Sequence, residues 1–143
     1  MNAMAITTLP AELRLRRVRL ATGPAAPAEA RTQVRRAIGN WEIPVDPYVA
    51  ALLTSELVTN AVRHETGETV TLAISCCRDQ LRVDVHDTSR SAPALVDAPA
   101  DAETGRGLTL VAILADEWGC YPTLWGKAVY FILAFQPGFP LDG

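Results

Sequence analysis

The amino-acid sequence predicts a two-layer α/β sandwich, in which about three helices cover one face of a mixed, mostly antiparallel sheet. Segments with helical spacing of apolar residues and segments with alternating apolar residues follow one another as strand, helix, helix, strand, strand, helix, strand, strand. The chain has 143 residues, of which 49% are hydrophobic and 20% charged, so it is long enough to bury the core of one domain. Three helices packed on one face would bury the apolar side of such a sheet.

The first part of the domain is predicted to contain one strand and two helices. Residues 13–21 are rich in Leu, Val and Arg and form the first strand. Residues 28–41 carry apolar residues at helical spacing and form the first helix. The second helix covers about residues 47–64, because Asp46 followed by Pro47 resembles an N-cap with proline at the first helical position.

The second part is predicted to contain a hairpin, a long loop, a helix and two strands. Apolar residues alternate with polar ones in residues 69–77 and 81–87, which predicts two strands paired as a hairpin. Residues 88–104 show little periodicity, and a loop of this length in a compact domain is often a functional lid. The remaining elements are expected to be a helix at about 108–116, a strand at 118–124, a turn at Gly126 and Lys127, and a strand at 128–135.

Composition and charge argue against several classes of protein. The formal net charge of −3 disfavours a nucleic-acid-binding protein, because binding to phosphates needs a concentrated positive surface, and the arginine-rich residues 14–19 are expected to be an exposed strand face. No segment approaches the roughly 20 apolar residues that span a bilayer, and residues 1–11 resemble a loose leader without the features of a signal peptide. Three cysteines and two histidines fit neither a disulfide framework nor a metal cluster. We therefore expect a cytoplasmic protein that contacts neither membrane nor nucleic acid.

The second predicted helix carries a stripe of residues that begins apolar and ends polar. Its members, on one side of a helical wheel, are Val49, Leu52, Leu53, Glu56, Asn60 and Arg63. Burying the polar groups costs free energy unless they are paired, so this end of the helix either emerges into solvent or lines a site. The carboxylate of Glu56 can polarise an attacking hydroxyl or water, and the amide oxygen of Asn60 can bind Mg²⁺.

Two further signals lie later in the chain. Asp87 ends a predicted strand just before the long loop, where its carboxylate can accept a hydrogen bond from an exocyclic amino group such as that of adenine. Gly105 and Gly107 open the third predicted helix, and a helix N-terminus favours phosphate through its free N–H groups and its dipole. Each signal is weak by itself, but the three together around a long loop indicate a nucleotide site much more specifically.

Four short stretches carry a resemblance to a known family. SELVTNAVRH at residues 55–64 resembles the N box of the GHKL ATPases, which have the Bergerat nucleotide-binding fold of histidine-kinase-like ATPases. VHDTS at 85–89 resembles the motif whose aspartate binds adenine, TGRGL at 104–108 the glycine motif that closes the lid on the phosphates, and GKAVYF at 126–131 the last box. The resemblance covers nearly the whole chain and implies an ATP-binding domain at residues 12–136, with a lid at about 88–106 and a tail at 137–143.

A stand-alone domain of this size most resembles the anti-sigma-factor serine kinases of the RsbW and SpoIIAB type. By position, the resemblance implies that Glu56 is the catalytic base that activates a serine hydroxyl, and that Asn60 holds the Mg²⁺ that bridges the ATP phosphates. It implies that Asp87 reads adenine, with a water held by Ser89 where the motif often has glycine. The other positions that it assigns to the nucleotide site are Arg63, His64, Gly105, Arg106, Gly107, Leu108 and Lys127.

The resemblance implies an ATP- and Mg²⁺-dependent serine/threonine protein kinase that acts as an anti-sigma factor. Its substrate would be a serine on a STAS-type anti-anti-sigma protein, its second partner a sigma factor, and its usual state a homodimer. One position departs from the family, because Glu103 stands where some of these kinases have a basic residue that could touch the γ-phosphate. Arg106 is then the candidate to replace that cation.

Two other functions stay open at this point. One is a regulatory module that binds nucleotide, lacks kinase activity and works by protein–protein binding, as Glu103 suggests. The other is an α/β interaction domain without any nucleotide, for which the polar helix stripe, the terminal aspartate and the glycine pair would be three coincidences.

Overall fold

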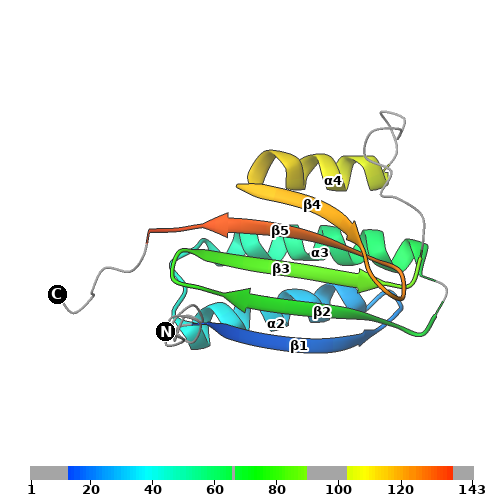
Figure 1. Ribbon diagram of the computed structural model, residues 1–143, viewed down its shortest axis with the longest axis horizontal. Helices are drawn as coiled ribbons and strands as arrows, with labels where there is room; N and C mark the ends of the chain where they lie inside the picture. Colours follow the sequence, from blue (N-terminus) through cyan, green and yellow to red (C-terminus); the bar gives the residue numbers. More distant parts are fainter. Residues whose placement is uncertain (1–12, 66, 90–102, 137–143) are drawn as a thin grey trace, which may run out of the picture.

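The computed structural model describes residues 13–65, 67–89 and 103–136, and shows a two-layer α/β sandwich (Figure 1). The predicted leader, most of the predicted lid and the predicted tail lie outside the described residues. The strands are β1 (Arg14–Ala21), β2 (Thr69–Cys76), β3 (Gln80–Asp87), β4 (Glu117–Pro122) and β5 (Lys127–Ala134), and the helices are α2 (Ala26–Trp41), α3 (Pro47–His64) and α4 (Glu103–Leu114).

The five strands form one sheet in the order β1-β2-β3-β5-β4, and every neighbouring pair is antiparallel. The three helices lie on one face of this sheet, with α3 packed between α2 and α4 (Figure 1). The predicted fold class, helices on one face of a largely antiparallel sheet, is therefore confirmed.

The core lies between the helices and the sheet because alternate strand residues point toward the helices. Leu20, Leu72, Val83 and Phe131 are fully buried on four different strands, and Leu53 of α3 is fully buried opposite them. Full burial of one such side chain contributes about 1.5–3 kcal/mol to folding. The core thus fixes which strand residues face the helix layer and which face the open side of the sheet.

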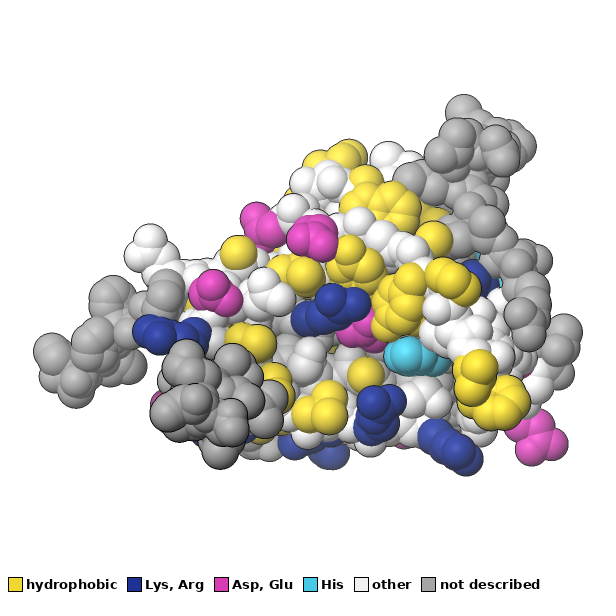
Figure 2. All heavy atoms as spheres, in the orientation of Figure 1, with side chains coloured by type: hydrophobic (Ala, Val, Ile, Leu, Met, Phe, Trp, Pro, Cys, Tyr) yellow, Lys and Arg dark blue, Asp and Glu magenta, His cyan; other side chains and the backbone are white. Residues whose placement is uncertain are grey.

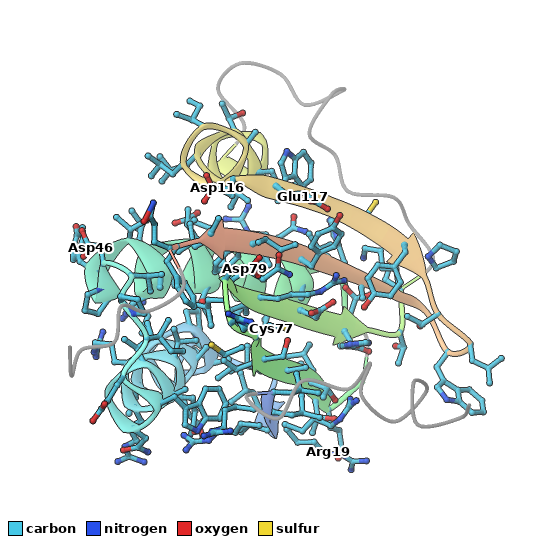
Figure 3. All side chains as sticks on the ribbon, turned by 60° about the vertical axis from the view of Figure 1, so that its left-hand side comes forward. Arg19, Asp46, Cys77, Asp79, Asp116 and Glu117 are labelled. Carbon is cyan, nitrogen blue, oxygen red and sulfur yellow. The ribbon has the colours of Figure 1, made fainter. Side chains whose placement is uncertain are left out.

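Local capping explains where two of the helices begin and end. The carboxylate of Asp46 accepts a hydrogen bond of 2.9 Å from the backbone N–H of Tyr48, and Pro47 opens α3, as the sequence predicts (Figure 3). At the end of α2, Glu42 adopts a left-handed conformation with φ of 53°, and its N–H bonds the carbonyl of Gly39.

Several predicted boundaries differ from the structure. The strand predicted at 118–124 is β4, Glu117–Pro122, and three further differences concern α2, α4 and Lys127. Helix α2 begins at Ala26, because Pro27 is compatible with the first turn of a helix. Helix α4 begins at Glu103, well before the predicted start near residue 108, so Gly105 and Gly107 belong to the helix. Lys127, predicted in a turn, is the first residue of β5, because it pairs with the last residue of β3.

The helices and the cysteines of the described residues were also compared with the predictions on membrane spans and disulfides. No helix in the described part of the chain is both long and apolar enough to cross a bilayer. Cys76, Cys77 and Cys120 all carry free thiols, as expected from their spacing.

Candidate functional site

The ends of α3 and β3 and the start of β5 meet at one end of the sandwich. The carboxylate of Glu65, directly after α3, accepts a 2.7 Å hydrogen bond from the backbone N–H of Thr88, directly after β3. The Thr88 hydroxyl donates a second hydrogen bond to the same carboxylate. Lys127 opens β5 as the cross-strand partner of Asp87. The structure therefore brings together three segments that are far apart in the sequence and that were predicted to share a site.

Asn60 is the least satisfied polar group of this region. Its side chain lies in the interior with 3% exposure, and neither its Oδ1 nor its Nδ2 has a hydrogen-bond partner among the described residues. A buried amide without partners costs roughly 1–3 kcal/mol, and such groups are rare in native structures. The arrangement is consistent with a ligand that supplies the missing partners.

Glu56 lies one helical turn before Asn60 and is half-buried. Its carboxylate makes no hydrogen bond or ion pair with any described residue. Leu53 and Leu57, on either side of it along the helix, are fully buried in the core. The polar end of the predicted stripe therefore begins at the rim of the core, where a carboxylate is accessible and free to accept a proton.

Asp87 and Lys127 form a buried ion pair across β3 and β5. The Nζ of Lys127 donates to Oδ2 of Asp87 at 2.9 Å and to Oδ1 at 3.1 Å. The backbone N–H of Ser89 donates to Oδ1 of the same carboxylate at 2.8 Å. Charge pairing and three donated hydrogen bonds keep the Asp87 carboxylate in one orientation.

His64, the last residue of α3, lies close enough to Asp87 and Lys127 for their charges to affect its pKa. Burial, then the nearby charge of Lys127 and that of Arg63, lower the pKa of His64, while the Asp87 carboxylate acts in the opposite direction. Its Nδ1 is buried without a hydrogen-bond partner among the described residues. The lowered pKa favours the neutral imidazole form of His64 at neutral pH. Arg63, the preceding residue, is exposed at the surface.

The glycine segment lies in the first turns of α4. Leu108 is fully buried and, with the buried Val111, holds this helix on the core beside α3. The backbone of residues 103–107 is helical, and the side chains of Glu103 and Arg106 lie outside what the structure describes. A helix start in this place offers N–H groups and a positive dipole end to an anion.

Sequence reasoning missed two contributions to the site. The Glu65–Thr88 contact carries no local signal, since it joins residues that are distant in the chain and become neighbours only in the folded sheet. The ion pair of Lys127 with Asp87 likewise depends on the register of β3 and β5. No group of three His, Cys, Asp or Glu side chains that could hold a metal ion is found in the described ranges.

Comparison with known proteins gives the family. No curated protein matches the chain. Residues 14–130, from the first strand to the last, match the family described as the histidine kinase-like ATPase domain. The match includes Glu56, Asn60, Asp87, the glycine segment and Lys127, and it implies ATP binding. The chain therefore belongs to the histidine kinase-like ATPase domain family.

Proposed function

We propose that this protein is an ATP-binding anti-sigma factor that acts as a Mg²⁺-dependent serine/threonine protein kinase on a STAS-type anti-anti-sigma partner. The observation that carries the proposal is the buried amide of Asn60, which has no hydrogen-bond partner among the described residues and lies one turn after the half-buried carboxylate of Glu56. Family membership supports nucleotide binding, and this pair of side chains supports phosphoryl transfer to a hydroxyl.

Asn60 fits the ligand position of a Mg²⁺ ion. Its buried Oδ1 lacks a partner among the described residues, and Mg²⁺ prefers oxygen ligands, usually one or two from the protein together with phosphate oxygens and waters. The bound ion would neutralise charge on the ATP phosphates. Asn60 would hold the ion at the same helix, α3, that carries Glu56.

Glu56 is the proposed base. An aspartate or glutamate within hydrogen-bond reach of a substrate hydroxyl accepts its proton as the oxygen attacks. Glu56 makes no contact with another described charged group, so its carboxylate is available to a serine or threonine of a protein substrate.

The contacts to adenine would come from β3, and the contacts to the ATP phosphates would come from α4. The Asp87 carboxylate, oriented by Ser89 and Lys127, accepts from the amino group of adenine. The segment from Gly105 to Leu108 would offer helix N-terminal N–H groups to the phosphates. Arg106, within this segment, is the residue proposed to supply a cation. Arg63 and His64 border the same end of α3.

The partners follow from the subtype that the sequence resembles. Such an anti-sigma factor would bind a sigma factor through its surface, phosphorylate a STAS-domain protein, form a homodimer and work in the cytoplasm. The support is the resemblance of the four motifs.

A second candidate is a nucleotide-dependent regulatory module without transferase activity. The observation that favours it is Glu103, the first residue of α4, because an acidic residue stands where a cation would help neutralise the γ-phosphate. This module would bind ATP and change its affinity for protein partners without transferring phosphate.

Calorimetric titration with ATP, with and without Mg²⁺, tests the first step, and radiolabelled ATP with a purified STAS-domain protein of the same organism tests the second. We expect Mg²⁺-dependent binding that Asn60→Ala abolishes, and phosphate transfer that Glu56→Gln stops while ATP binding persists. Binding without transfer in the unmodified protein would favour the regulatory module. Undiminished transfer by Glu56→Gln would remove Glu56 as the base.

A further inference from the structure

The open face of the sheet, opposite the helices, contains a pocket with a volume of about 490 Å³. Arg17 and Arg19 of β1 form one side, His86 of β3 lies on its floor, and Leu124 and Trp125 of the β4–β5 turn form the far wall. Figure 2 views this face, and basic side chains and a histidine lie beside apolar side chains at one end of it. The volume is within the range of ligand sites.

The pocket lies mainly on the face of the sheet opposite Glu56 and Asn60. Successive residues of a strand point to opposite faces, so the His86 side chain lies on the open face while that of Asp87 points toward the helices. Glu56 and Asn60 lie on α3, on the other side of the sheet (Figure 1). Asp87 and Thr88 also line the pocket where β3 ends, so the pocket borders the nucleotide site, while its other lining residues are not among those assigned to ATP.

The basic side of the pocket is unusual for this chain. The formal net charge is −3, yet β1 contains four arginines, and alternation places Arg17 and Arg19 together on the open face, about 7 Å apart along the strand. Both are exposed, and neither forms a hydrogen bond or an ion pair with a described residue. Figure 3 shows Arg19 pointing away from the helix layer.

Asp84, an acidic residue on the open face, is already paired with other side chains of the sheet. Both carboxylate oxygens of Asp84 accept hydrogen bonds from Arg82, at 2.9 and 3.0 Å, and Oδ2 also accepts from Tyr121 at 2.7 Å. Burial and the charge of Arg17 lower the pKa of His86 more than neighbouring carboxylates raise it, so this imidazole is neutral at neutral pH. Arg17 and Arg19 are thus two cations positioned to bind an anion from outside the described chain.

The other side of the pocket is apolar and faces solvent. Leu124 and Trp125 are 77% and 75% exposed, although large apolar side chains are normally covered. Tryptophan and arginine are both enriched among the residues that contribute most of the binding energy in protein–protein interfaces.

We propose that this pocket is a docking site for an acidic, extended segment of a partner protein, which pairs carboxylates with Arg17 and Arg19 and places an apolar side chain against Trp125. The two arginines supply the charge complementarity, and the turn supplies the apolar contact. A peptide segment uses both features at once, whereas a small anion would use the arginines alone.

The test uses fluorescence anisotropy with the full chain and two labelled synthetic peptides. One peptide repeats Glu-Leu-Asp-Phe, and the other repeats Gln-Leu-Asn-Phe. We expect saturable binding of the acidic peptide that weakens with salt, and at least tenfold weaker binding of the neutral peptide. Arg17→Glu/Arg19→Glu and, separately, Trp125→Ala should each weaken the acidic peptide at least tenfold.

The matched control is Arg35→Glu/Arg36→Glu, which reverses two exposed charges on α2, in the opposite layer. It should keep the peptide affinity, and the Arg17/Arg19 variant should keep its ATP affinity and melting temperature. If that variant unfolds, Arg17→Gln/Arg19→Gln replaces it.

Four results would overturn the proposal. They are equal binding of both peptides, no binding of either, equal loss in the α2 control, and stronger competition by a single-stranded oligonucleotide than by the acidic peptide. A Trp125-dependent dimer in sedimentation that excludes the peptide would likewise replace it with a second copy of this chain.

Discussion

The hydroxyl of Tyr121 on β4 donates a 2.7 Å hydrogen bond to Oδ2 of Asp84 on β3, across the intervening strand β5. Arg82 pairs with the same carboxylate and lies over the ring of Tyr130, with 4.1 Å between the guanidinium carbon and the ring centroid. Asp84 is only 7% exposed although it lies on the open face. This network ties three strands together on the side of the sheet that no described helix covers.

Replacing Tyr121 with phenylalanine should lower the free energy of unfolding by about 1–2 kcal/mol, because Asp84 loses one partner of a charged hydrogen bond. Urea denaturation at pH 7.5 measures this change. Tyr48→Phe is the control, since Tyr48 is 73% exposed and its substitution should change stability by less than about 0.5 kcal/mol.

Tyr121 should also make the stability of the fold depend on pH in the alkaline range. Burial, followed by the hydrogen bond to Asp84, raises the pKa of Tyr121 from 10 to about 12. Because the folded pKa lies above the unfolded one, this contribution to stability is complete below pH 10 and is lost as the pH rises toward 12. Tyrosinate absorbance should show a late ionisation step that Tyr121→Phe removes, and persistence of that step would assign it to another tyrosine.

The ion pair of Lys127 with Asp87 should be costly to break from one side. Lys127→Met leaves a buried carboxylate without its cation and should lower the free energy of unfolding by about 3–5 kcal/mol. The double variant Asp87→Asn/Lys127→Met removes both charges and should be more stable than the sum of the single changes predicts. Urea denaturation of the four proteins completes the cycle, and strictly additive effects would mean that the two charges do not stabilise each other.

Replacing Asn60 should affect ligand binding far more than stability, in contrast to replacing Lys127. Asn60→Ala removes a buried amide that has no partner among the described residues, so the ligand-free protein should change in stability by less than about 1 kcal/mol. Its affinity for ATP with Mg²⁺ should fall at least tenfold in calorimetry. Thr54→Ala, a buried polar change on the same helix, is the control that should keep ATP affinity. A loss of more than about 3 kcal/mol in Asn60→Ala would show that the amide supports the core instead of a ligand.

Two glycines should respond oppositely to alanine. A Cβ at Gly126 would overlap the carbonyl oxygen of Asp87 and the backbone of Thr88, whereas a Cβ at Gly39 in α2 would meet nothing within 4 Å. Gly126→Ala should therefore destabilise the protein by about 1–3 kcal/mol, and Gly39→Ala should stabilise it by up to about 1 kcal/mol. Thermal unfolding measures both, and a neutral Gly126→Ala would mean that the turn moves away without cost.

The sequence predicted those parts of the structure that depend on local interactions. The Asp46–Pro47 start of α3 was correct, because an N-cap and its helix are adjacent in the chain. The start of α4 was placed too late, since glycine has low helix propensity and the burial of Leu108 and Val111 against the core outweighs it.

In the candidate site, too, only the features that depend on residues close together in the sequence could be predicted. The spacing of Glu56 and Asn60 on one helix face was visible in the sequence, because one helical turn joins them. The burial of Asn60 without a hydrogen-bond partner in the described part of the chain depends on contacts between elements distant in the sequence. The pairing of Lys127 with Asp87 depends on such contacts as well. The roles of both residues toward ATP and Mg²⁺ stay predictions.

The buried pairing of Asp87 with Lys127 also limits the alternative sheets that the chain could form. These residues are direct partners in the alignment of β3 with β5. A slip of one residue between the two strands would turn Lys127 toward the open face and leave the Asp87 carboxylate alone among apolar side chains. Misaligned sheets are therefore penalised by an isolated charge as well as by exposed apolar surface. A single cross-strand contact thus helps to select one folded state among several that a hydrophobic pattern alone would permit.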